Sequence, residues 1–268
     1  MNPIPGKPGV VALLTDFGMQ DDYVGQMHAA ILSVDPEIRI IDLCHAVPAG
    51  NVRAAAFLLR HDLETLPEGS VVAVVVDPGV GTDRALLVAQ IGSRFLVAPD
   101  NGVIAPLIDD GRAGQVRRLE NRGWGRLNPS NTFHGRDIIG PAAARIASGE
   151  SIEESGPMLD RWETLTIQPV EQDGVVTGEV LWVDRFGNLV TNLEAELEVN
   201  AIVTIGSQEL RRVFTFAEAE QGETVWLVGS RGTIEIVRKG QSAADVLGIG
   251  WGAAVQRLDN RHGGTSGR

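Results

Sequence analysis

Three apolar runs rich in β-branched residues constrain the first half of this chain more than any other feature. They are VVALLT, IRIIDL and SVVAVVV, at residues 10–15, 38–43 and 70–76. Between them, apolar residues recur at helical spacing over residues 21–34 and 51–63. Strands that are apolar along their whole length and alternate with helices are typical of a mostly parallel sheet with helices on both faces. We therefore predict an N-terminal α/β domain.

The ends of these predicted strands carry acids. In sheets of this kind, ligands bind beyond the carboxyl ends of the strands. Asp16 follows the first run and Asp77 follows the third, so both are expected along one edge. The stretch RALLVAQIGSRFLVAPDNG predicts two further strands with a turn at Gly92, and a helix is predicted to begin near His134.

The amino-acid composition of the chain changes after residue 150. A polar segment rich in Gly and Pro predicts a boundary, which places the α/β domain at residues 8–160. Short β-rich runs without helices then predict a smaller all-β domain, a sandwich or a barrel-like fold, at residues 172–258. Residues 259–268 are predicted to be a disordered tail.

The composition of the chain excludes several kinds of binding partner and cross-link. The net charge is −12 and the only lysines are Lys7 and Lys239, which argues against binding nucleic acid. No window approaches the roughly 18 continuous apolar residues of a membrane span. The N-terminus also lacks the apolar core of a signal peptide, so a cytoplasmic protein is expected. The single cysteine, Cys44, excludes a disulfide or a thiolate metal cluster within one chain.

Three carboxylates lie close together in TDFGMQDDY, namely Asp16, Asp21 and Asp22. Acids at a helix start stabilise the helix dipole or cap free amides, and we assign that role to Asp22. Asp16 is the functional candidate, since an acid at the tip of a first strand can accept both hydroxyls of a ribose. No HxH, HExxH or CxxC spacing is present, so no metal site is predicted.

The loop DPGVGTDR has Asp77 at one end and Arg84 at the other. The pair is either an ion pair that staples the loop or part of a reactive site. His134, in TFHGRD, is either a structural group at a helix start or a neutral general base kept uncharged by the helix dipole. Spacing alone does not bring the three side chains together. In the second half, the segments VDRFGNLVTN and GSRGTIEIVR are each typical of a hairpin with a glycine at its turn, and this structural role is enough to explain their residues.

Six motifs in order resemble the S-adenosylmethionine hydroxide adenosyltransferase family, the S-adenosylmethionine hydrolases related to fluorinases and chlorinases. They are LLTDFGMQDDYVG, VVVDPGVGTDR, APDNG, TFHGRD, VDRFGNLVTN and SRGTIEIVR. The resemblance covers residues 10–257. It implies an α/β domain joined to a C-terminal β-barrel, and a homotrimer with the ligand between the N-terminal domain of one subunit and the C-terminal domain of its neighbour.

The same resemblance implies chemistry and residues. Water or hydroxide attacks C5′ of the ribose of S-adenosylmethionine, which gives adenosine and L-methionine without a cofactor. Asp77, Arg84 and His134 match the family's water-handling residues. Substrate binding falls on Asp16 for the ribose, on Asp21, Asp184, Ser230 and Arg231 for the methionine end, and on Asn188, with Phe186 and Arg238, for the adenine.

Alternatives remain open at this point. A halogenase that forms a 5′-halo-5′-deoxyadenosine is one, although the chain has the Asp, Arg and His trio that halogenases lack. The chain also has Gly135 where the fluorinating enzymes carry a serine. A protein that binds adenosine or S-adenosylmethionine without turnover is a second. Metal-dependent phosphoester hydrolysis, suggested by the carboxylate cluster at Asp16, is a third.

Overall fold

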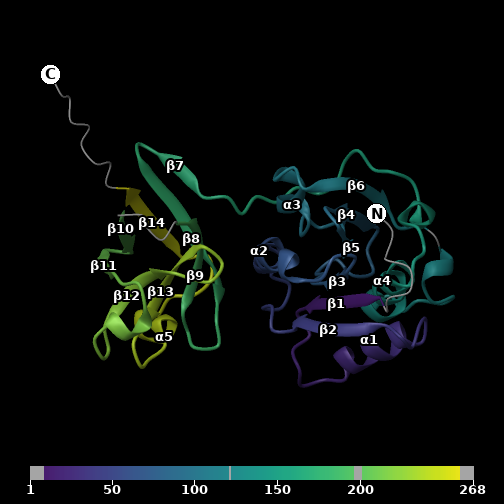
Figure 1. The fold of residues 1–268 in the computed structure, drawn as a ribbon, viewed down its shortest axis with the longest axis horizontal. Coiled ribbons are helices and arrows are strands. Elements are labelled where there is room, and N and C mark those ends of the chain that lie inside the picture. The colour runs from purple at the N-terminus through teal and green to yellow at the C-terminus, as the bar shows by residue number, and fades with distance from the viewer. Residues whose placement is uncertain (1–8, 121, 196–200, 260–268) are drawn as a thin grey trace. The chain divides into compact units, whose positions relative to one another are not determined.

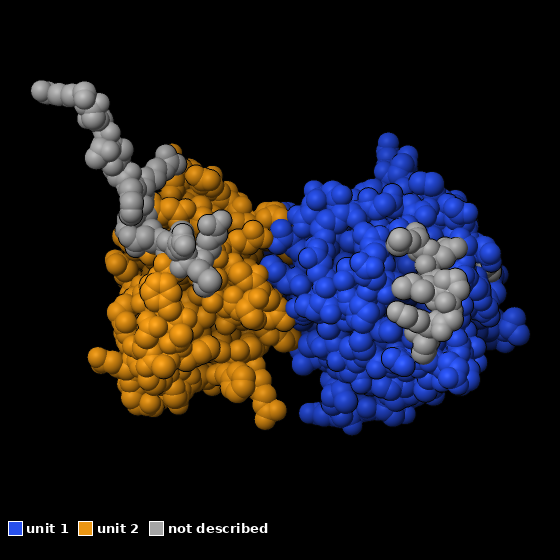
Figure 2. Space-filling model, in the orientation of Figure 1, with its two compact units in different colours: residues 1–166 blue, residues 167–268 orange. Residues whose placement is uncertain are grey.

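The chain folds as two compact units, Met1–Thr166 and Ile167–Arg268 (Figures 1 and 2). The structure, a computed structural model, describes residues 9–120, 122–195 and 201–259. The predicted tail lies outside these residues except for Asp259, which is the last residue of a strand. Among the helices of the described ranges, none has both the length and the apolar composition needed to cross a membrane.

The first unit is built on a six-stranded sheet in the order β2-β1-β3-β5-β4-β6 (Figure 1). The strands are β1 Val10–Thr15, β2 Arg39–Cys44, β3 Val71–Val75, β4 Leu86–Ile91, β5 Arg94–Pro99 and β6 Ala113–Arg118. β1 pairs in parallel with β2 and β3, and β3 pairs in parallel with β5. β4 is antiparallel to both of its neighbours. The prediction of a mostly parallel sheet is confirmed, and so is the turn between β4 and β5.

Helices cover this sheet on both faces. They are α1 Tyr23–Leu32, α2 Val52–Asp62, α3 Ala105–Asp109 and α4 Gly140–Ala147, with short turns η1 Leu63–Thr65, η2 Arg122–Trp124, the π-helix η3 Gly135–Ile139 and η4 Ile152–Ser155. Val11 and Leu13 of β1 share a buried cluster with Met27 of α1 and with α4. The alternate side chains Ala12 and Leu14 are equally buried, and α2 lies against β1. This explains why the strand runs are apolar throughout.

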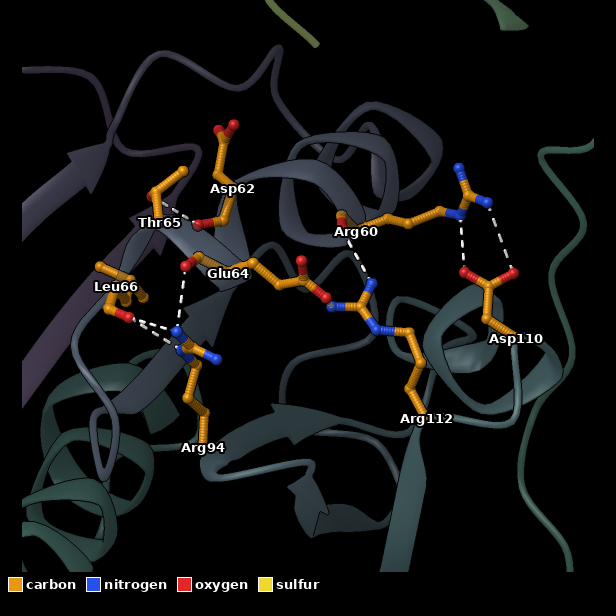
Figure 3. A network of polar contacts seen from close by, with 8 residues as sticks. All are labelled: Arg60, Asp62, Glu64, Thr65, Leu66, Arg94, Asp110 and Arg112. Carbon is orange, nitrogen blue, oxygen red and sulfur yellow. Dashed lines mark hydrogen bonds and ion pairs between the residues drawn. The ribbon is translucent and has the colours of Figure 1, made fainter. Parts of the chain in front are cut away.

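An arginine network ties together the amino-terminal side of β3, β5 and β6 (Figure 3). Arg94 donates to the carbonyl oxygens of Leu66 (2.9 Å from Nε) and Glu64 (3.0 Å from Nη2). Arg112 donates to the carbonyl of Arg60 at 3.1 Å and to the carboxylate of Glu64 at 2.8 Å. Ligands bind at the opposite, carboxyl ends of such strands, so we regard these contacts as structural.

The second unit is a closed barrel of seven strands. They are β8 Val175–Val183, β9 Leu189–Glu194, β10 Ala201–Ile205, β11 Gln208–Arg212, β12 Thr224–Val228, β13 Thr233–Arg238 and β14 Ala254–Asp259. Pairing of β14 with β8 closes the barrel, and β7 Val170–Gln172 adds to β8 outside it. The described residues of this unit also form two short helices, η5 Phe216–Glu218 and α5 Ala243–Leu247. The predicted barrel-like all-β domain is confirmed.

Candidate active site

Asp16 and Asp77 lie at the carboxyl ends of β1 and β3, the adjacent parallel strands at the centre of the first sheet. Oδ2 of Asp16 accepts a hydrogen bond from the backbone N–H of Gly50 at 2.8 Å. Burial raises the pKa of Asp16, and the negative charge of Asp77 adds to this, while the Gly50 hydrogen bond opposes it. The two acids therefore share one electrostatic environment, as their positions at the strand ends predicted.

Asp77, Arg84 and His134 form a contiguous cluster. Nε of Arg84 donates to Oδ1 and Oδ2 of Asp77 at 2.7 and 2.8 Å, and Nη2 also contacts Oδ2. The same Nη2 lies 3.0 Å from Nδ1 of His134. The side chains of Arg84 and Asp77 are only 10% and 4% exposed. This pair is therefore far more buried than a solvent-exposed ion pair that only stabilises a loop.

The loop between Asp77 and Arg84 is shaped by its close approach to the segment that precedes His134. Gly81 has φ +81°, and a Cβ at this position would lie 2.5 Å from the carbonyl oxygen of Asn131. Any other residue here would push the two segments apart. The hydroxyl of Thr82 donates to the carbonyl of Gly79 at 2.7 Å and closes the turn. The glycine thus brings the two ends of the loop into reach of His134.

His134 is the residue that precedes the π-helix η3, as a position at a helix start predicted. Burial lowers its pKa, and the cation of Arg84 lowers it further. Because a guanidinium can only donate, Nδ1 of His134 accepts in this contact, and the hydrogen of the neutral ring is on Nε2. His134 also lines two neighbouring cavities of about 390 and 480 Å³, together with Leu86, Leu119 and Ile138.

Three aromatic side chains of the motifs TDFGMQDDY and TFHGRD pack on one another. The rings of Phe17, Tyr23 and Phe133 are mutually 5.3–5.6 Å apart, and Arg136 lies over Phe133 at 4.9 Å. Phe17 and Phe133 directly follow and precede candidate residues in the chain, which is the signal that could have found them.

The other two acids of TDFGMQDDY are exposed. Asp22 stands immediately before α1, but its carboxylate does not cap the helix. It accepts instead from the side-chain amide of Gln26 at 2.8 Å, so the capping contact is absent, while the position at the helix start agrees with the prediction.

In the second unit, Asp184 organises the turn between β8 and β9. Its Oδ1 accepts from the backbone N–H groups of Phe186 (2.8 Å) and Asn188 (2.9 Å), and its Oδ2 accepts from Nδ2 of Asn188 at 2.8 Å. Asn188 is consequently buried, whereas the Phe186 side chain is 75% exposed.

A cavity of about 720 Å³ opens beside this turn. It is lined by the predicted residues Phe186, Asn188 and Arg238, and also by Phe216, Gln241 and Ser242. Arg238 donates to Gln241 at 2.9 Å and to Thr224 at 2.7 Å, which fixes its stem along the wall. Two phenylalanines around a buried amide suit a flat heteroaromatic ring. The signal for Phe216 was an aromatic residue in a stretch of alternating alanine and glutamate, FAEAE.

Ser230 and Arg231 lie on the turn between β12 and β13. A further carboxylate, Glu235, was not predicted. Burial raises the pKa of Glu235, the charge of Asp184 raises it further, and the charge of Arg231 lowers it. Asp184, Arg231 and Glu235 thus share one neighbourhood. Within the described ranges, no group of three or more His, Cys, Asp or Glu side chains is arranged to hold a metal ion.

The two units together define a class of protein: an α/β domain with a buried acid, arginine and histidine cluster at its ligand edge, followed by a β-barrel with an aromatic-lined cavity. Models of the S-adenosylmethionine (SAM) hydroxide adenosyltransferase N-terminal and C-terminal domains match residues 11–156 and 178–256. The chain belongs to this family.

Relatives with established names agree with this assignment. An (R)-S-adenosyl-L-methionine hydrolase of Salinispora tropica is 38% identical over 250 residues, which cover 89% of this chain and 94% of the relative. A fluorinase of Actinopolyspora mzabensis is more distant, 25% identical over 287 residues that cover 92% of this chain and 96% of the relative. The solved structure of an uncharacterized conserved protein from Thermotoga maritima is similar with a TM-score of 0.86 and 34% identity, covering 92% of this chain and 99% of that one.

Proposed function

We propose that this protein hydrolyses S-adenosyl-L-methionine to adenosine and L-methionine by attack of water or hydroxide at C5′ of the ribose. The observation that carries the proposal is the buried Asp77, Arg84 and His134 cluster, which lies at the sheet edge that also holds Asp16. The hydrolases among the relatives, at 38% identity, support the same reaction. No metal or other cofactor takes part in the proposed step.

Arg84 is the group that stabilises the nucleophile in this proposal. Its Nε and Nη2 atoms are engaged by Asp77 and His134, whereas Nη1 has no hydrogen-bond partner within the described residues. The two N–H groups of Nη1 can donate to a water molecule or to the hydroxide that forms from it. Donors that are held in place before the reaction stabilise developing charge most effectively. Asp77 holds the guanidinium in that orientation.

His134 is the proton acceptor of the proposal. Hydrolysis of the sulfonium substrate by water releases one proton, and among the three groups only an imidazole has a lone pair basic enough near neutral pH. Its lowered pKa keeps the ring neutral at pH 7. In the resting arrangement the lone pair of Nδ1 holds Arg84, so His134 also orients the guanidinium until the proton is transferred.

We expect kcat to fall as the pH falls through a midpoint below 6.5, the ordinary pKa of histidine. Protonation of His134 removes the acceptor for the Arg84 N–H and places two cations side by side. Measurement of kcat against pH checks this, with His134→Gln, which cannot protonate, as the variant in which the acid limb disappears from the residual rate. An acid limb with its midpoint above 6.5, or one that persists in His134→Gln, contradicts the assignment. Protonation of Asp16 can be told apart from protonation of His134, because the loss of the Asp16 charge weakens substrate binding and therefore raises KM rather than lowering kcat.

Recognition of the substrate is assigned to both units. Asp16 is the ribose ligand, and the cavity of Phe186, Asn188, Phe216 and Arg238 is the adenine site. Ammonium and carboxylate groups of the methionine end suit the acids Asp21 and Asp184 and the donors Ser230 and Arg231. We further propose that the protein is a homotrimer in which each site combines the N-terminal domain of one subunit with the C-terminal domain of its neighbour, as the family resemblance implies.

The environment of Gly135 favours hydrolysis over halogenation. A Cβ at this position would lie 2.9 Å from Cγ1 of Val75 and 3.1 Å from Sδ of Met27. The hydroxyl side chain that fluorinating enzymes carry here would therefore require the side chain of Val75 or Met27 to shift. The tight packing around Gly135 therefore supports a site that handles water and lacks the hydroxyl group of the fluorinating enzymes.

Product analysis in isotopically labelled water tests the proposal. With S-adenosyl-L-methionine and no added metal, we expect equal amounts of adenosine and L-methionine, with the label on the 5′-oxygen of adenosine and no dependence on chloride. Formation of 5′-chloro-5′-deoxyadenosine in chloride buffer would establish the halogenase instead. Stoichiometric retention of the substrate without product would establish a binding protein, and activity lost to a chelator would establish a metal-dependent hydrolase.

A further inference from the structure

A chain of polar contacts runs from the surface of α1 to the end of β1. Nε2 of His28 lies 2.8 Å from Oδ1 of Asp42, and Nε2 of His45 lies 3.0 Å from the same oxygen. Nδ1 of His45 lies 2.8 Å from the hydroxyl of Thr15. Thr15 is fully buried and His45 is 6% exposed. Asp42 and His28 lie nearer the surface, with side chains 41% and 33% exposed. The chain of contacts thus leads from this half-exposed pair to a buried histidine and threonine, which are hydrogen-bond partners of each other.

The hydrogen-bond directions in this chain follow from Asp42. Partial burial works against the charged form, but hydrogen bonds from His45 and His28 hold the pKa of Asp42 below its usual value. An ionised carboxylate only accepts, so both Nε2 atoms donate to it. In the neutral ring, Nδ1 of His45 then accepts the hydroxyl hydrogen of Thr15. Neither His45 nor Thr15 has a role in the reaction proposed above.

The network ends on the loop that carries Asp16. Thr15 directly precedes Asp16, and the carbonyl of His45 accepts from the backbone N–H of Gly18 at 2.7 Å. Five residues after His45, Gly50 donates its N–H to Oδ2 of Asp16 at 2.8 Å. The segment 45–50 therefore holds the segment 15–18 at three points, through a side chain, a carbonyl and an amide. We call these three contacts the clasp.

We propose that His45, acting through Thr15, is a positioning residue that sets the Asp16 carboxylate for recognition of the ribose hydroxyls. The proposal rests on the function proposed above. The clasp holds Oδ2 through the Gly50 N–H, and the backbone N–H of Asp16 itself also contacts the carboxylate, so the orientation of this group is set by the main chain around it. A carboxylate distinguishes a ribose with two neighbouring hydroxyls from a ribose without them only when its plane is fixed. If the carboxylate rotates, the hydrogen bonds to the two hydroxyls lose their geometry.

The proposal predicts that Thr15→Val weakens recognition of the ribose hydroxyls specifically. Valine has the shape of threonine without the hydroxyl, so Nδ1 of His45 loses its partner while the packing of β1 is preserved. The affinities of adenosine and of 2′,3′-dideoxyadenosine, measured by calorimetry, report the effect without any need for turnover. In the unaltered protein we expect adenosine to bind about tenfold or more tightly than the dideoxy compound, since the hydroxyls bond to a charged acceptor.

Thr15→Val is expected to reduce this preference to about twofold, mainly by weaker adenosine binding. Thr15→Ser, the matched control, keeps the hydroxyl and is expected to keep the preference. Should Thr15→Val fold poorly in thermal unfolding, His45→Asn and His45→Leu replace it: the asparagine amide reaches the place of Nδ1 and retains the preference, whereas leucine loses it.

The outcomes separate this proposal from the proposed function. An unaltered protein with the hydroxyl preference and a Thr15→Val variant with the same preference overturn the positioning role and leave the hydrolase intact. A variant that weakens adenosine and the dideoxy compound equally also overturns it, because that is the result of a merely structural role. An unaltered protein that shows no preference at all overturns the positioning role and the assignment of Asp16 to the ribose, whereas hydrolysis itself is decided by the product analysis.

Discussion

The double variant Asp77→Asn/Arg84→Met is expected to remain folded and to lose nearly all turnover. The two residues are the most buried ion pair of the candidate site, with side chains 4% and 10% exposed. Arg84→Met alone leaves the carboxylate of Asp77 buried without its cation, which should lower the free energy of unfolding by about 3–5 kcal/mol. Asparagine at position 77 removes that charge, so the double variant should recover most of the loss.

Activity should not recover with stability. Loss of a pre-arranged donor to a developing anion typically lowers kcat by about 10²–10³-fold, and removal of Arg84 takes away both N–H groups of Nη1. Arg84→Lys should be nearly as inactive because an ammonium cannot contact Asp77, His134 and water in the planar arrangement of a guanidinium.

The matched control is Arg112→Met. Arg112 belongs to the structural network at the opposite edge of the sheet (Figure 3) and should change stability without changing kcat. Chemical denaturation and steady-state kinetics on the same preparations provide both quantities. A double variant that is stable and retains turnover within a few-fold of the unaltered protein removes Arg84 from the mechanism.

The centre of the first sheet was predictable because β1 and β3 are buried on both faces, whereas the edge strand β2 has Arg39 and Asp42 exposed. In the strand VVAVV every side chain is apolar, and only a sheet covered on both sides buries all of them. The carboxyl ends of β1 and β3 then placed Asp16 and Asp77 on one edge. The barrel was predictable in class from its short strands, but not its closure by β14 and β8, because strand pairing depends on contacts between residues about 80 positions apart.

The contacts within the candidate site were less accessible to sequence reasoning. Arg84 and His134 are separated by 50 positions, and only the fold brings them to 3.0 Å. Thr15 and His45 carry no motif that marks a hydrogen bond, since threonine and histidine are common in other roles. Phe216 lies in a single short helical turn with weak local signals. In each case the position of the side chain is decided by tertiary packing, which propensity and periodicity do not encode.

The largest gain of activity is expected when two inactive variants are combined. His134→Leu removes the proton acceptor of the N-terminal domain, and Arg231→Met removes a proposed ligand of the methionine carboxylate from the C-terminal domain. Each variant alone should show little turnover. If each site combines domains of two subunits, co-expression gives mixed trimers in which some interfaces join an intact N-terminal domain to an intact C-terminal domain.

With equal amounts of the two chains and random assembly, about one quarter of the interfaces are intact, so the mixture should reach about one quarter of the unaltered specific activity. Two affinity tags, one on each variant, isolate the mixed species, and light scattering establishes the number of chains. A second combination, His134→Leu with Asp77→Asn, is the control: both changes lie in the N-terminal domain, so no mixed interface is intact. Equal, negligible activity in both combinations places each site within a single chain and contradicts the shared trimeric site.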